Sequence, residues 1–462
     1  IRDQDSWVHQ KEPEAATAKA KDLVRMSVAR ASLLRPLVET SLTVNPRALV
    51  VGGGIAGMNA ALGLARQGFE SIIVEKGAEL GGMARNIPHT IDGLHVSEYL
   101  AKLVGEVQAN SKIEVLTGAR LSGVSGYKGN FVSQIENGAG GPREFNHGAI
   151  IVATGAREYK PTEFLYGQSD RIMTQLELGK LLSNNPGDIS NWNRVIMIQC
   201  VGSRNEENPN CSRICCQGAV KHALELKQLN PEMDVVVFYR DMRTYGVLED
   251  YYTKARQAGV LFVRFDEKHP PEVSKDSEWP FSVSFVDHVL RRPVKMSADA
   301  VILSAATLAE ENEELAMLLK VPRNPEGFFI EAHAKLRPVD FASEGIYLCG
   351  TAHGPKLIPE TIAQSMAAAA RAASFLSSKD VTVGGVVAQV EPGLCAACLV
   401  CVRNCPYGVP RINDQDVSEI NEALCQGCGI CVSECPAKAI RLGHYADDQI
   451  MIKVDALLEG VI

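Results

Sequence analysis

The 462-residue sequence lacks several features that would point to a membrane or to nucleic acid. No stretch approaches the roughly 18 consecutive apolar residues that a membrane-spanning helix needs, so we expect no direct membrane span. No secretory signal peptide is visible at the N-terminus. The formal net charge is −8 without a long run of one sign, which argues against a nucleic-acid partner.

The composition is nevertheless rich in cysteine, with thirteen residues. Without a signal peptide, these cysteines are expected to be metal ligands in a reducing, anaerobic cytoplasm rather than disulfides. Hydrophobic residues make up 46% of the chain, and its length is too great for one core, so we expect about three domains. The chain begins at Ile1 instead of methionine, which favours a processed product or a fragment.

Two matched cysteine runs close the sequence: Cys395-x2-Cys398-x2-Cys401-x3-Cys405-Pro406 and Cys425-x2-Cys428-x2-Cys431-x3-Cys435-Pro436. This is the spacing of the bacterial two-cluster ferredoxins, in which the fourth cysteine of each run binds the other cluster. Each corner of a [4Fe-4S] cube needs a thiolate, and a tight loop with two residues between cysteines reaches three corners. The expected ligands are therefore Cys395, Cys398, Cys401 and Cys435 for the first cluster, and Cys425, Cys428, Cys431 and Cys405 for the second.

Zinc and disulfides are the alternatives for these runs. A zinc site needs four ligands and has no use for the Cys-Pro ending. Disulfides need an oxidising compartment, which nothing in the sequence indicates.

A dinucleotide-binding βαβ unit is predicted near the start of the chain. A strand at Ala48–Val51 precedes Gly52-Gly53-Gly54-Ile55-Ala56-Gly57, an alanine-rich helix to about Gln67, and a strand at Ser71–Val74 that ends in Glu75. Gly52 makes the tight turn, Gly54 lets the backbone approach a pyrophosphate, and Gly57 permits close helix–strand packing. The helix N-terminus faces the phosphates, and Glu75 lies where an acidic group binds ribose hydroxyls.

Three later segments favour FAD over NAD. These are Gly81-Gly82, Ala153-Thr154-Gly155 after a strand, and Gly350-Thr351 before an alanine-rich helix. The layout resembles the two-dinucleotide-binding flavoproteins of the thioredoxin reductase type, in which this set surrounds FAD. That family usually has Gly-Asp at the third segment, and Thr351 supplies a hydroxyl without the charge. The expected FAD-binding residues are Gly52, Gly54, Ile55, Ala56, Gly57, Glu75, Lys76, Gly82, Arg85, Ala153, Thr154, Gly155, Gly350 and Thr351.

Residues 158–324 hold the place of the NADPH-binding domain in those flavoproteins. The strand Arg194–Gln199 leads into Cys200-Val-Gly-Ser instead of a glycine-rich phosphate loop, and further cysteines follow before a helix that carries a lysine. We therefore expect no NAD(P) here. Four thiolates within this short segment are expected to hold a third [4Fe-4S] cluster, through Cys200, Cys211, Cys215 and Cys216. The alternative is a set of small buried cysteines.

The string Cys200-Val-Gly-Ser-Arg, followed by Cys211-Ser-Arg-Ile-Cys-Cys216 and Lys221, resembles the A-type subunit of heterodisulfide reductase (HdrA), as does Ser6-Trp-Val-His9 with the helix that follows it. The resemblance covers essentially the whole chain. In that family the matching cysteines hold an iron–sulfur cluster close to FAD. It implies that Lys221 lies near the flavin N5 and tunes its potential, whereas without the resemblance Lys221 would be interpreted as a solvated helix lysine.

Two departures from the methanogen form indicate a compact relative. The region from Ser122 to Phe145 is short and cysteine-free where that form carries an inserted ferredoxin domain, and the cluster-associated N-terminal domain is absent or truncated. Such HdrA-like iron–sulfur flavoproteins serve in tungsten-type benzoyl-CoA reductase and in quinone-interacting oxidoreductase complexes.

The fold class predicted is α/β: a two-dinucleotide-binding, thioredoxin reductase-like flavoprotein with a C-terminal α+β two-cluster ferredoxin domain. Its parts are expected to be an N-terminal helical docking segment (1–46), a first FAD-binding part (47–157), an NAD(P)-domain-like insert with the cysteine motif (158–324), a second FAD-binding part (325–378), a linker (379–394) and the ferredoxin domain (395–462).

The resemblance implies an electron-transfer protein with FAD and iron–sulfur clusters, part of an anaerobic multi-subunit oxidoreductase, in which the flavin bifurcates or confurcates electrons. It implies other redox subunits as partners (HdrB/HdrC-like, MvhD-like, or a reductase or dehydrogenase subunit) and a homodimer within the complex. The alternatives are a stand-alone NAD(P)H-dependent flavin reductase that passes electrons to ferredoxin clusters, and a passive electron-conducting subunit.

A few further residues carry open interpretations. Cys349 is expected to be a buried core cysteine. His353, Lys356 and Glu360 follow the third flavin segment and either line the flavin pocket or are exposed polar loop residues. Arg85 is a candidate for contact with a phosphate or with the flavin edge.

Overall fold

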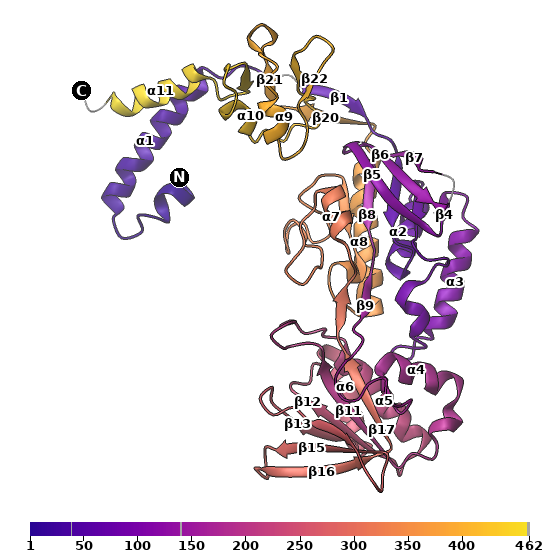
Figure 1. The fold of residues 1–462 in the computed structure, drawn as a ribbon. Coiled ribbons are helices and arrows are strands. Elements are labelled where there is room, and N and C mark those ends of the chain that lie inside the picture. Colours follow the sequence, from indigo (N-terminus) through magenta and orange to yellow (C-terminus); the bar gives the residue numbers. More distant parts are fainter. Residues whose placement is uncertain (38, 139–140, 460–462) are drawn as a thin grey trace. The chain divides into compact units, whose positions relative to one another are not determined.

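The computed structural model describes residues 1–37, 39–138 and 141–459. The chain divides into two compact units, one formed by Val44–Ser378 and the other by Ile1–Thr43 together with Lys379–Ile462 (Figure 1). Three short stretches lie outside the described residues: 38 in the expected N-terminal segment, 139–140 in the expected first FAD-binding part, and 460–462 at the end of the expected ferredoxin domain.

The larger unit contains a five-stranded parallel sheet in the order β19-β8-β2-β3-β4. Its strands are nearly continuous apolar runs, because both faces of a parallel sheet are buried. Helices α2 and α8 pack against each other beside this sheet. The elements are β2 (Arg47–Val51), α2 (Ile55–Arg66), β3 (Glu70–Val74), α3 (Val96–Gln108), β4 (Ile113–Leu116), β8 (Ala149–Val152), β19 (Ile346–Leu348) and α8 (Ile358–Leu376).

A three-stranded antiparallel sheet shares the core of this first half. It consists of β5 (Ala119–Tyr127), β6 (Asn130–Asn137) and β7 (Arg143–His147). Phe131 and Ile135 from this sheet lie in one buried cluster with Leu49 and Ile150 of the parallel sheet.

The second half of the larger unit repeats this plan. Its parallel sheet has the order β10-β17-β11-β12-β13, and an antiparallel sheet of β14, β15 and β16 shares a buried cluster with it. The elements are β10 (Ile172–Thr174), α4 (Gln175–Asn184), β11 (Arg194–Val201), α5 (Cys215–Leu229), β12 (Asp234–Tyr239), α6 (Glu249–Gln257), β13 (Leu261–Arg264), β14 (Glu272–Lys275), β15 (Phe281–Asp287), β16 (Arg292–Ala298) and β17 (Ala300–Ala305).

Two short antiparallel strands connect the halves, as Figure 1 shows for the first of them. They are β9 (Ala156–Glu158) and β18 (Thr307–Ala309), and α7 (Glu313–Leu319) follows the second. Because the chain leaves and re-enters the first half through this pair, residues from both halves meet beside it.

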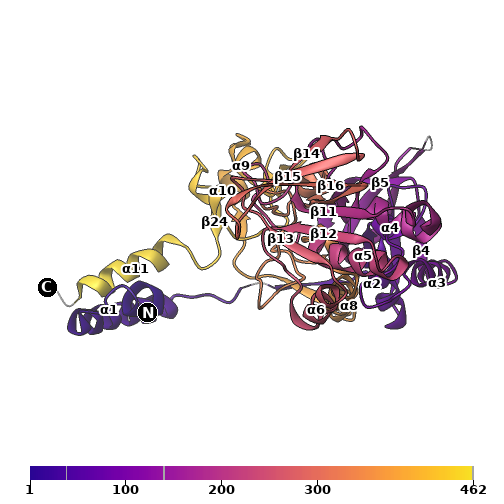
Figure 2. The same ribbon diagram turned by 90° about the horizontal axis from the view of Figure 1, so that it is seen from below.

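The smaller unit combines the two chain ends. Helix α1 (Pro13–Ser32) packs against α11 (Asp447–Leu458), and the two lie side by side in Figures 1 and 2. The Arg25 guanidinium donates to the Ala456 carbonyl oxygen at 3.2 Å, and the Gln449 side-chain amide donates to the Leu33 carbonyl oxygen at 3.0 Å. The N-terminal segment expected to be helical thus contains a helix that begins at Pro13 and ends at Ser32.

Short strands and helices make up the rest of the smaller unit. The segment 379–394, expected as a linker, contains two strands that pair within the unit, β20 with β1 and β21 with β24. The elements are β1 (Glu39–Thr43), β20 (Asp380–Gly384), β21 (Ala388–Val390), α9 (Val400–Asn404), β22 (Arg411–Ile412), β23 (Ser418–Glu419), α10 (Ile430–Ser433) and β24 (Ile440–Leu442). Within the described ranges, the helices are all too short or too polar to cross a membrane.

Candidate functional site

A cavity of about 1750 Å³ lies at the carboxyl ends of the strands of the first parallel sheet. This edge is where open α/β sheets bind their ligands. Most of the residues predicted to bind FAD line this cavity: Gly52, Gly54, Ile55, Ala56, Glu75, Lys76, Gly82, Ala153, Thr154, Gly155 and Thr351.

The glycines of the first turn differ in what surrounds them. Gly52 has φ +113°, and a Cβ there would lie 2.3 Å from the Ala153 carbonyl oxygen. A Cβ on Gly57 would lie 1.9 Å from the Gly52 carbonyl oxygen, so this glycine lies beneath the turn instead of lining the cavity. Gly54, in contrast, has no atom of the described residues within 4 Å of its Cβ position. Its backbone is therefore open to a ligand.

Polar groups at the same end of the cavity fit a dinucleotide. One Glu75 carboxylate oxygen accepts from the Gly53 N–H at 2.7 Å and the other from the Gly77 N–H at 2.6 Å, which fixes the carboxylate beside the turn. The Thr154 hydroxyl is buried without a hydrogen-bond partner among the described residues. Since buried hydroxyls usually have a partner, this one suits a polar ligand.

Three of the predicted residues do not line the cavity. Gly57 and Gly350 lie in the wall behind the cavity. Gly57 packs beneath the first turn, and the Gly350 N–H donates to the Gln364 side-chain oxygen at 2.9 Å. Arg85 is engaged elsewhere, with Nε donating to the Leu80 carbonyl oxygen at 2.7 Å and Nη1 2.7 Å from Glu79. The structure therefore does not bring Arg85 to this site.

The segment after Gly350 supplies a lysine to the cavity. Lys356 lines it, and its Nζ donates to the carbonyl oxygens of Gly350 and Gly354, both at 2.9 Å. Burial, reinforced by the nearby Arg213 and opposed by Glu360, lowers the pKa of Lys356 to about 8. Of the two interpretations left open by the sequence, the structure favours the pocket-lining one for Lys356.

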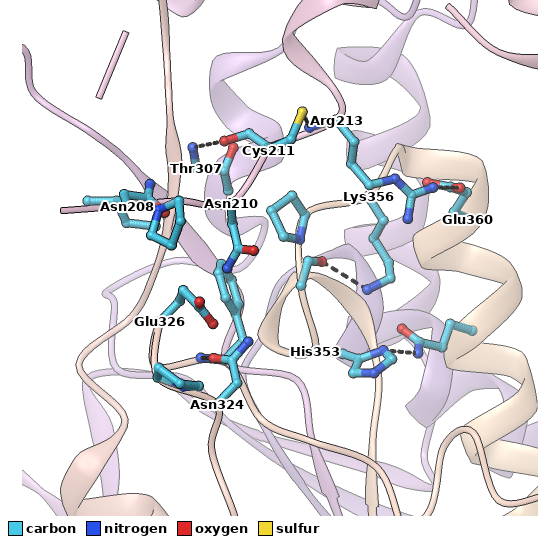
Figure 3. A pocket seen from close by; sticks show the side chains of 18 of the residues that line it. Asn208, Asn210, Cys211, Arg213, Thr307, Asn324, Glu326, His353, Lys356 and Glu360 are labelled. Carbon is cyan, nitrogen blue, oxygen red and sulfur yellow. Dashed lines mark hydrogen bonds and ion pairs between the residues drawn. The ribbon is translucent and has the colours of Figure 1, made fainter. Parts of the chain in front are cut away.

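A second cavity, of about 970 Å³, is drawn in Figure 3 and shares Thr307, Glu326 and Lys356 with the first. In Figure 3, Arg213, Lys356, Glu360 and His353 lie on one side of this cavity, with Asn208, Asn324 and Glu326 on the other. His353 is held between Glu331, at 2.7 Å from Nε2, and Gln364, at 2.8 Å from Nδ1. Cys211 also lines this space.

The four cysteines of the second half converge at the carboxyl end of β11 and the start of α5. Cys200 has φ +64°, which bends the chain at the strand end, and Cys215 and Cys216 begin the helix. Burial raises the pKa of the Cys215 thiol far above its usual range, and neighbouring Cys216, Cys200 and Cys211 raise it further. The thiols are therefore close enough to influence one another's ionisation.

Cations surround this cysteine group. Burial raises the pKa of Cys200, while Arg204 and Arg240 act in the opposite direction. Burial likewise raises the pKa of Cys216 to about 11, against a hydrogen bond from the Arg243 backbone. Of the four thiols, Cys216 is buried and the others are partly buried. Such thiols beside arginines fit a site whose thiolates are stabilised by bound iron.

Lys221 lies on α5 beyond the cysteines, and its Nζ donates to the His89 carbonyl oxygen at 2.9 Å. Burial lowers the pKa of Lys221, and Glu225 opposes this effect. Lys221 is not among the described residues that line either cavity. It is thus a half-buried lysine rather than a fully solvated one, and it points to the segment around His89.

The cysteine runs of the smaller unit form two groups. A small cavity is lined by Cys395, Cys398, Cys401 and Cys435. For Cys431, burial and then the thiols of Cys425, Cys405 and Cys428 raise the pKa to about 11. The fourth cysteine of each run is therefore near the first three of the other run, which is the exchange expected from the spacing.

Backbone N–H groups point at several of these sulfurs. Ser418 donates to Cys395 at 3.3 Å, Ala388 to Cys425 at 3.4 Å, and Ala439 to Cys435 at 3.3 Å. Such bonds stabilise charged cluster sulfurs. All thirteen cysteines are free thiols. In the part of the chain that the structure describes, no three His, Cys, Asp or Glu side chains form a site for a single metal ion.

Comparison with known proteins identifies the family. Residues 50–117 match the NAD(P)-binding Rossmann-like domain, and residues 418–441 match the 4Fe-4S binding domain. The A-type subunit of the H(2):CoB-CoM heterodisulfide,ferredoxin reductase of Methanothermobacter thermautotrophicus is 34% identical, over 99% of this chain and 83% of the relative. The chain belongs to the heterodisulfide reductase A (HdrA) family. The A-type iron-sulfur subunit of the CoB–CoM heterodisulfide reductase of Methanocaldococcus jannaschii is 32% identical, over 100% of this chain and 84% of the relative.

Solved structures agree on the fold of this HdrA family member. The thioredoxin reductase of T. acidophilum has a TM-score of 0.50 at 16% identity, covering 72% of this chain and 98% of that one. The thioredoxin reductase of Lactococcus lactis in the FR conformation has a TM-score of 0.50 at 18% identity, covering 71% and 98%. The predicted family and fold class are thus confirmed, and the chain is an oxidoreductase subunit with a flavoprotein fold and a 4Fe-4S binding domain.

The sequence did not predict that Lys356 lines two adjoining cavities. It also missed Arg204, whose guanidinium lies beside Cys200 and is 2.7 Å from Asp241. No spacing rule marks either residue, because the walls of the two cavities at Lys356 and the pair of Arg204 with Asp241 join segments that are distant in the sequence.

Proposed function

We propose that this HdrA-like chain transfers electrons through FAD and iron–sulfur clusters within an anaerobic multi-subunit oxidoreductase, and that its flavin site bifurcates or confurcates electrons. The observation that carries the proposal is the convergence of four cysteines, next to the flavin-type cavity, where the second dinucleotide fold would hold a phosphate. FAD bound in the larger cavity would accept or give two electrons as a pair and exchange them singly with iron–sulfur clusters.

The chain's residues hold these groups as follows in the proposal. The turn at Gly54 and the carboxylate of Glu75 bind the pyrophosphate and ribose of FAD, and Thr154 and Thr351 offer hydroxyls to it. Three [4Fe-4S] clusters are bound by the two ferredoxin groups and by the group Cys200, Cys211, Cys215 and Cys216. The proposal places the chain in the cytoplasm, a reducing compartment in which cysteines stay available as cluster ligands.

The partners in this proposal are other redox subunits. The M. thermautotrophicus relative is named a subunit of a heterodisulfide and ferredoxin reductase, which supports partner subunits in general. HdrB/HdrC-like, MvhD-like, or other reductase or dehydrogenase subunits would exchange electrons with the ferredoxin groups, and the chain would form a homodimer in the complex. Lys221 is proposed to act on the flavin from α5; its bond to the His89 carbonyl means that this action would pass through the segment around His89.

Iron and flavin content per chain tests the cluster assignment. We expect about twelve irons and one FAD in anaerobically purified protein. A Cys211→Ser, Cys216→Ser double variant should retain about eight irons and one FAD, because the ferredoxin cysteines remain. Cys349→Ser is the matched control, since Cys349 is buried outside the three groups and its loss should remove no iron. About eight irons in the unaltered protein would contradict a third cluster.

A stand-alone NAD(P)H-dependent reductase is the second candidate, favoured by the presence of a second dinucleotide-type sheet. The structure argues against it at Gly202, where a Cβ position lies 2.3 Å from the Tyr159 ring, so this glycine offers no open backbone to a phosphate. Mixing the FAD-loaded chain with NADH under anaerobic conditions should leave the flavin absorbance unchanged. Rapid bleaching by the chain alone would favour the second candidate.

A further inference from the structure

Lys356 lies where the two cavities of the larger unit meet. It lines the cavity of about 1750 Å³ that we assign to FAD and also the adjoining cavity of about 970 Å³ (Figure 3). Thr307 and Glu326 share this position. The side chain is therefore in reach both of a ligand in the first cavity and of solvent in the second.

The bonds of Lys356 leave it one donor for a ligand. A lysine ammonium has three N–H groups, and two point to the carbonyl oxygens of Gly350 and Gly354 at 2.9 Å. Both carbonyls belong to the segment in which thioredoxin reductase-type flavoproteins carry Gly-Asp. Here Thr351 replaces the acid and a lysine follows closely, so the local charge changes from negative to positive.

The charges around Lys356 come from three segments. Arg213, paired with Glu360, approaches from the start of α5, and Glu331 with His353 lies on the loop side. Glu360, Cys349 and Glu331 favour the ammonium form, whereas burial and Arg213 disfavour it, and the pKa settles at about 8. A lysine with this pKa gains or loses its charge within the range of pH that most proteins tolerate.

The other lysines near the cavity are less suited to this role. Lys76 lines the cavity beside Glu75, at the ribose end, but is exposed and paired with Glu310 at 2.7 Å. Lys221 donates to the His89 carbonyl oxygen and lines neither cavity among the described residues. Lys356 is thus the lysine that places positive charge on the inner wall, which is formed by the Gly350 segment and the N-terminus of α8.

We propose that Lys356 supplies the positive charge that stabilises electrons on the flavin, and that its Nζ exchanges a proton with the second cavity as the site gains or loses them. This inference rests on the proposed function, because it requires FAD in the larger cavity. A positive charge in a site of low dielectric favours added negative charge strongly. When Nζ is neutral, each pair of electrons that iron–sulfur donors deliver draws one proton from water in the second cavity onto Nζ.

The sign of the pH dependence follows from the charge of the lysine. Below about pH 8 the ammonium is charged, and its full effect raises the flavin reduction potential. As the pH rises above this value, the oxidised site loses the Nζ proton and the advantage over an uncharged side chain declines. An arginine at position 356 stays charged throughout and should show no such decline.

The test is a spectroelectrochemical titration of the flavin in the full, FAD- and cluster-loaded chain at about pH 6.5 and about pH 9.5. The variants are Lys356→Met, Lys356→Gln and Lys356→Arg. Glutamine keeps N–H donors for the two carbonyl oxygens without the charge, which guards against a variant that simply loses its fold. Lys102→Met is the matched control, because Lys102 is 78% exposed on α3 of the same unit.

At the lower pH we expect the Met and Gln variants to favour oxidised flavin about tenfold relative to the unaltered chain, which is about 30 mV for a two-electron couple. The difference should shrink at the higher pH, and Lys356→Arg should keep a high potential at both. Potentials of the Met and Gln variants equal to the unaltered chain, or a difference that does not change with pH, would overturn the inference alone. Absence of flavin from the unaltered chain would overturn the proposed function with it.

Discussion

The turn after β2 and the turn after β11 occupy equivalent places in the two halves of the larger unit, yet they offer different groups to a ligand. The first contains Gly54, whose Cβ position is open, and the second contains Gly202, whose Cβ position is filled by the Tyr159 ring. Thiols replace the open backbone in the second turn, with Cys215 and Cys216 at the N-terminus of α5. One fold therefore carries an open glycine turn in one half and a cysteine group in the other.

The difference shows that a parallel α/β sheet does not by itself determine which ligand binds at its edge. Both sheets place a loop and a helix N-terminus at the carboxyl ends of their strands, where electropositive N–H groups meet an incoming group. A diphosphate and an iron–sulfur cluster with its thiolates both carry negative charge, so the same helix end suits either. The side chains of the loop decide between them.

Adding one methyl group to the glycine of each turn is expected to have the largest effect and should separate the two turns most clearly. Gly54→Ala should weaken FAD binding about a hundredfold, since 1.4 kcal/mol corresponds to a factor of ten and a methyl group in a close contact costs about 1–3 kcal/mol. The thermal stability of the Gly54→Ala protein without FAD should barely change, because the Cβ position of Gly54 is open among the described residues.

Gly202→Ala should behave in the opposite way. Its Cβ would meet Tyr159 at 2.3 Å with φ at +68°, so stability should fall by about 1–3 kcal/mol while FAD affinity persists. Fluorescence titration of FAD and thermal unfolding measure the two quantities. Gly105→Ala, on α3 with an open Cβ position, is the control for both. Equal losses of FAD affinity in the two turn variants would show that the second turn also binds a dinucleotide.

A smaller effect is expected from Glu75→Gln. The carboxylate accepts from the N–H groups of Gly53 and Gly77, and bonds to a charged group contribute about 1.5–3 kcal/mol each at most. Glutamine keeps one oxygen acceptor, so FAD affinity should fall about tenfold, with iron content unchanged. Titration of flavin-free protein with FAD measures this. Unchanged affinity would mean that Glu75 only braces its own loop.

The smallest expected effect is at the cysteine turn. Arg204→Gln removes a cation beside Cys200 and frees Asp241, which lies 2.7 Å from the guanidinium. The reduced form of the cluster proposed at this turn should lose stabilisation by up to about tenfold, which is about 59 mV for a one-electron couple. Electron paramagnetic resonance during a redox titration measures the shift. Arg66→Gln, in an exposed pair with Glu106, is the control, and a potential raised by R204Q would contradict the assignment of the cluster.

Much of the fold could be predicted from local patterns. The strand, glycine turn and helix from Ala48 to Gln67 form a contiguous unit, and β2 and α2 are found there. The segment 379–394 was harder, because its glycines and proline are typical of a linker. Its strands β20 and β21 exist through pairing with β1 and β24, which are distant in the sequence.

The site was predictable to a similar extent. Glycines that must approach a ligand, such as Gly54, carry their own signal in the spacing. Arg85 carried no comparable signal, and the structure engages it with Leu80 and Glu79 instead of the cavity. The domain boundaries, the cluster count and the role of Lys221 stay predictions.

The sequence by itself determined the family, the fold class and the two types of cysteine pattern, because spacing within one loop limits which atoms a short chain can bring to a ligand. Only the tertiary structure decided that Lys356 joins two cavities and that Tyr159 closes the second turn at Gly202. These contacts depend on how separate segments pack around β9 and β18. Packing of side chains far apart in the chain leaves no periodicity or spacing in the sequence from which it could be inferred.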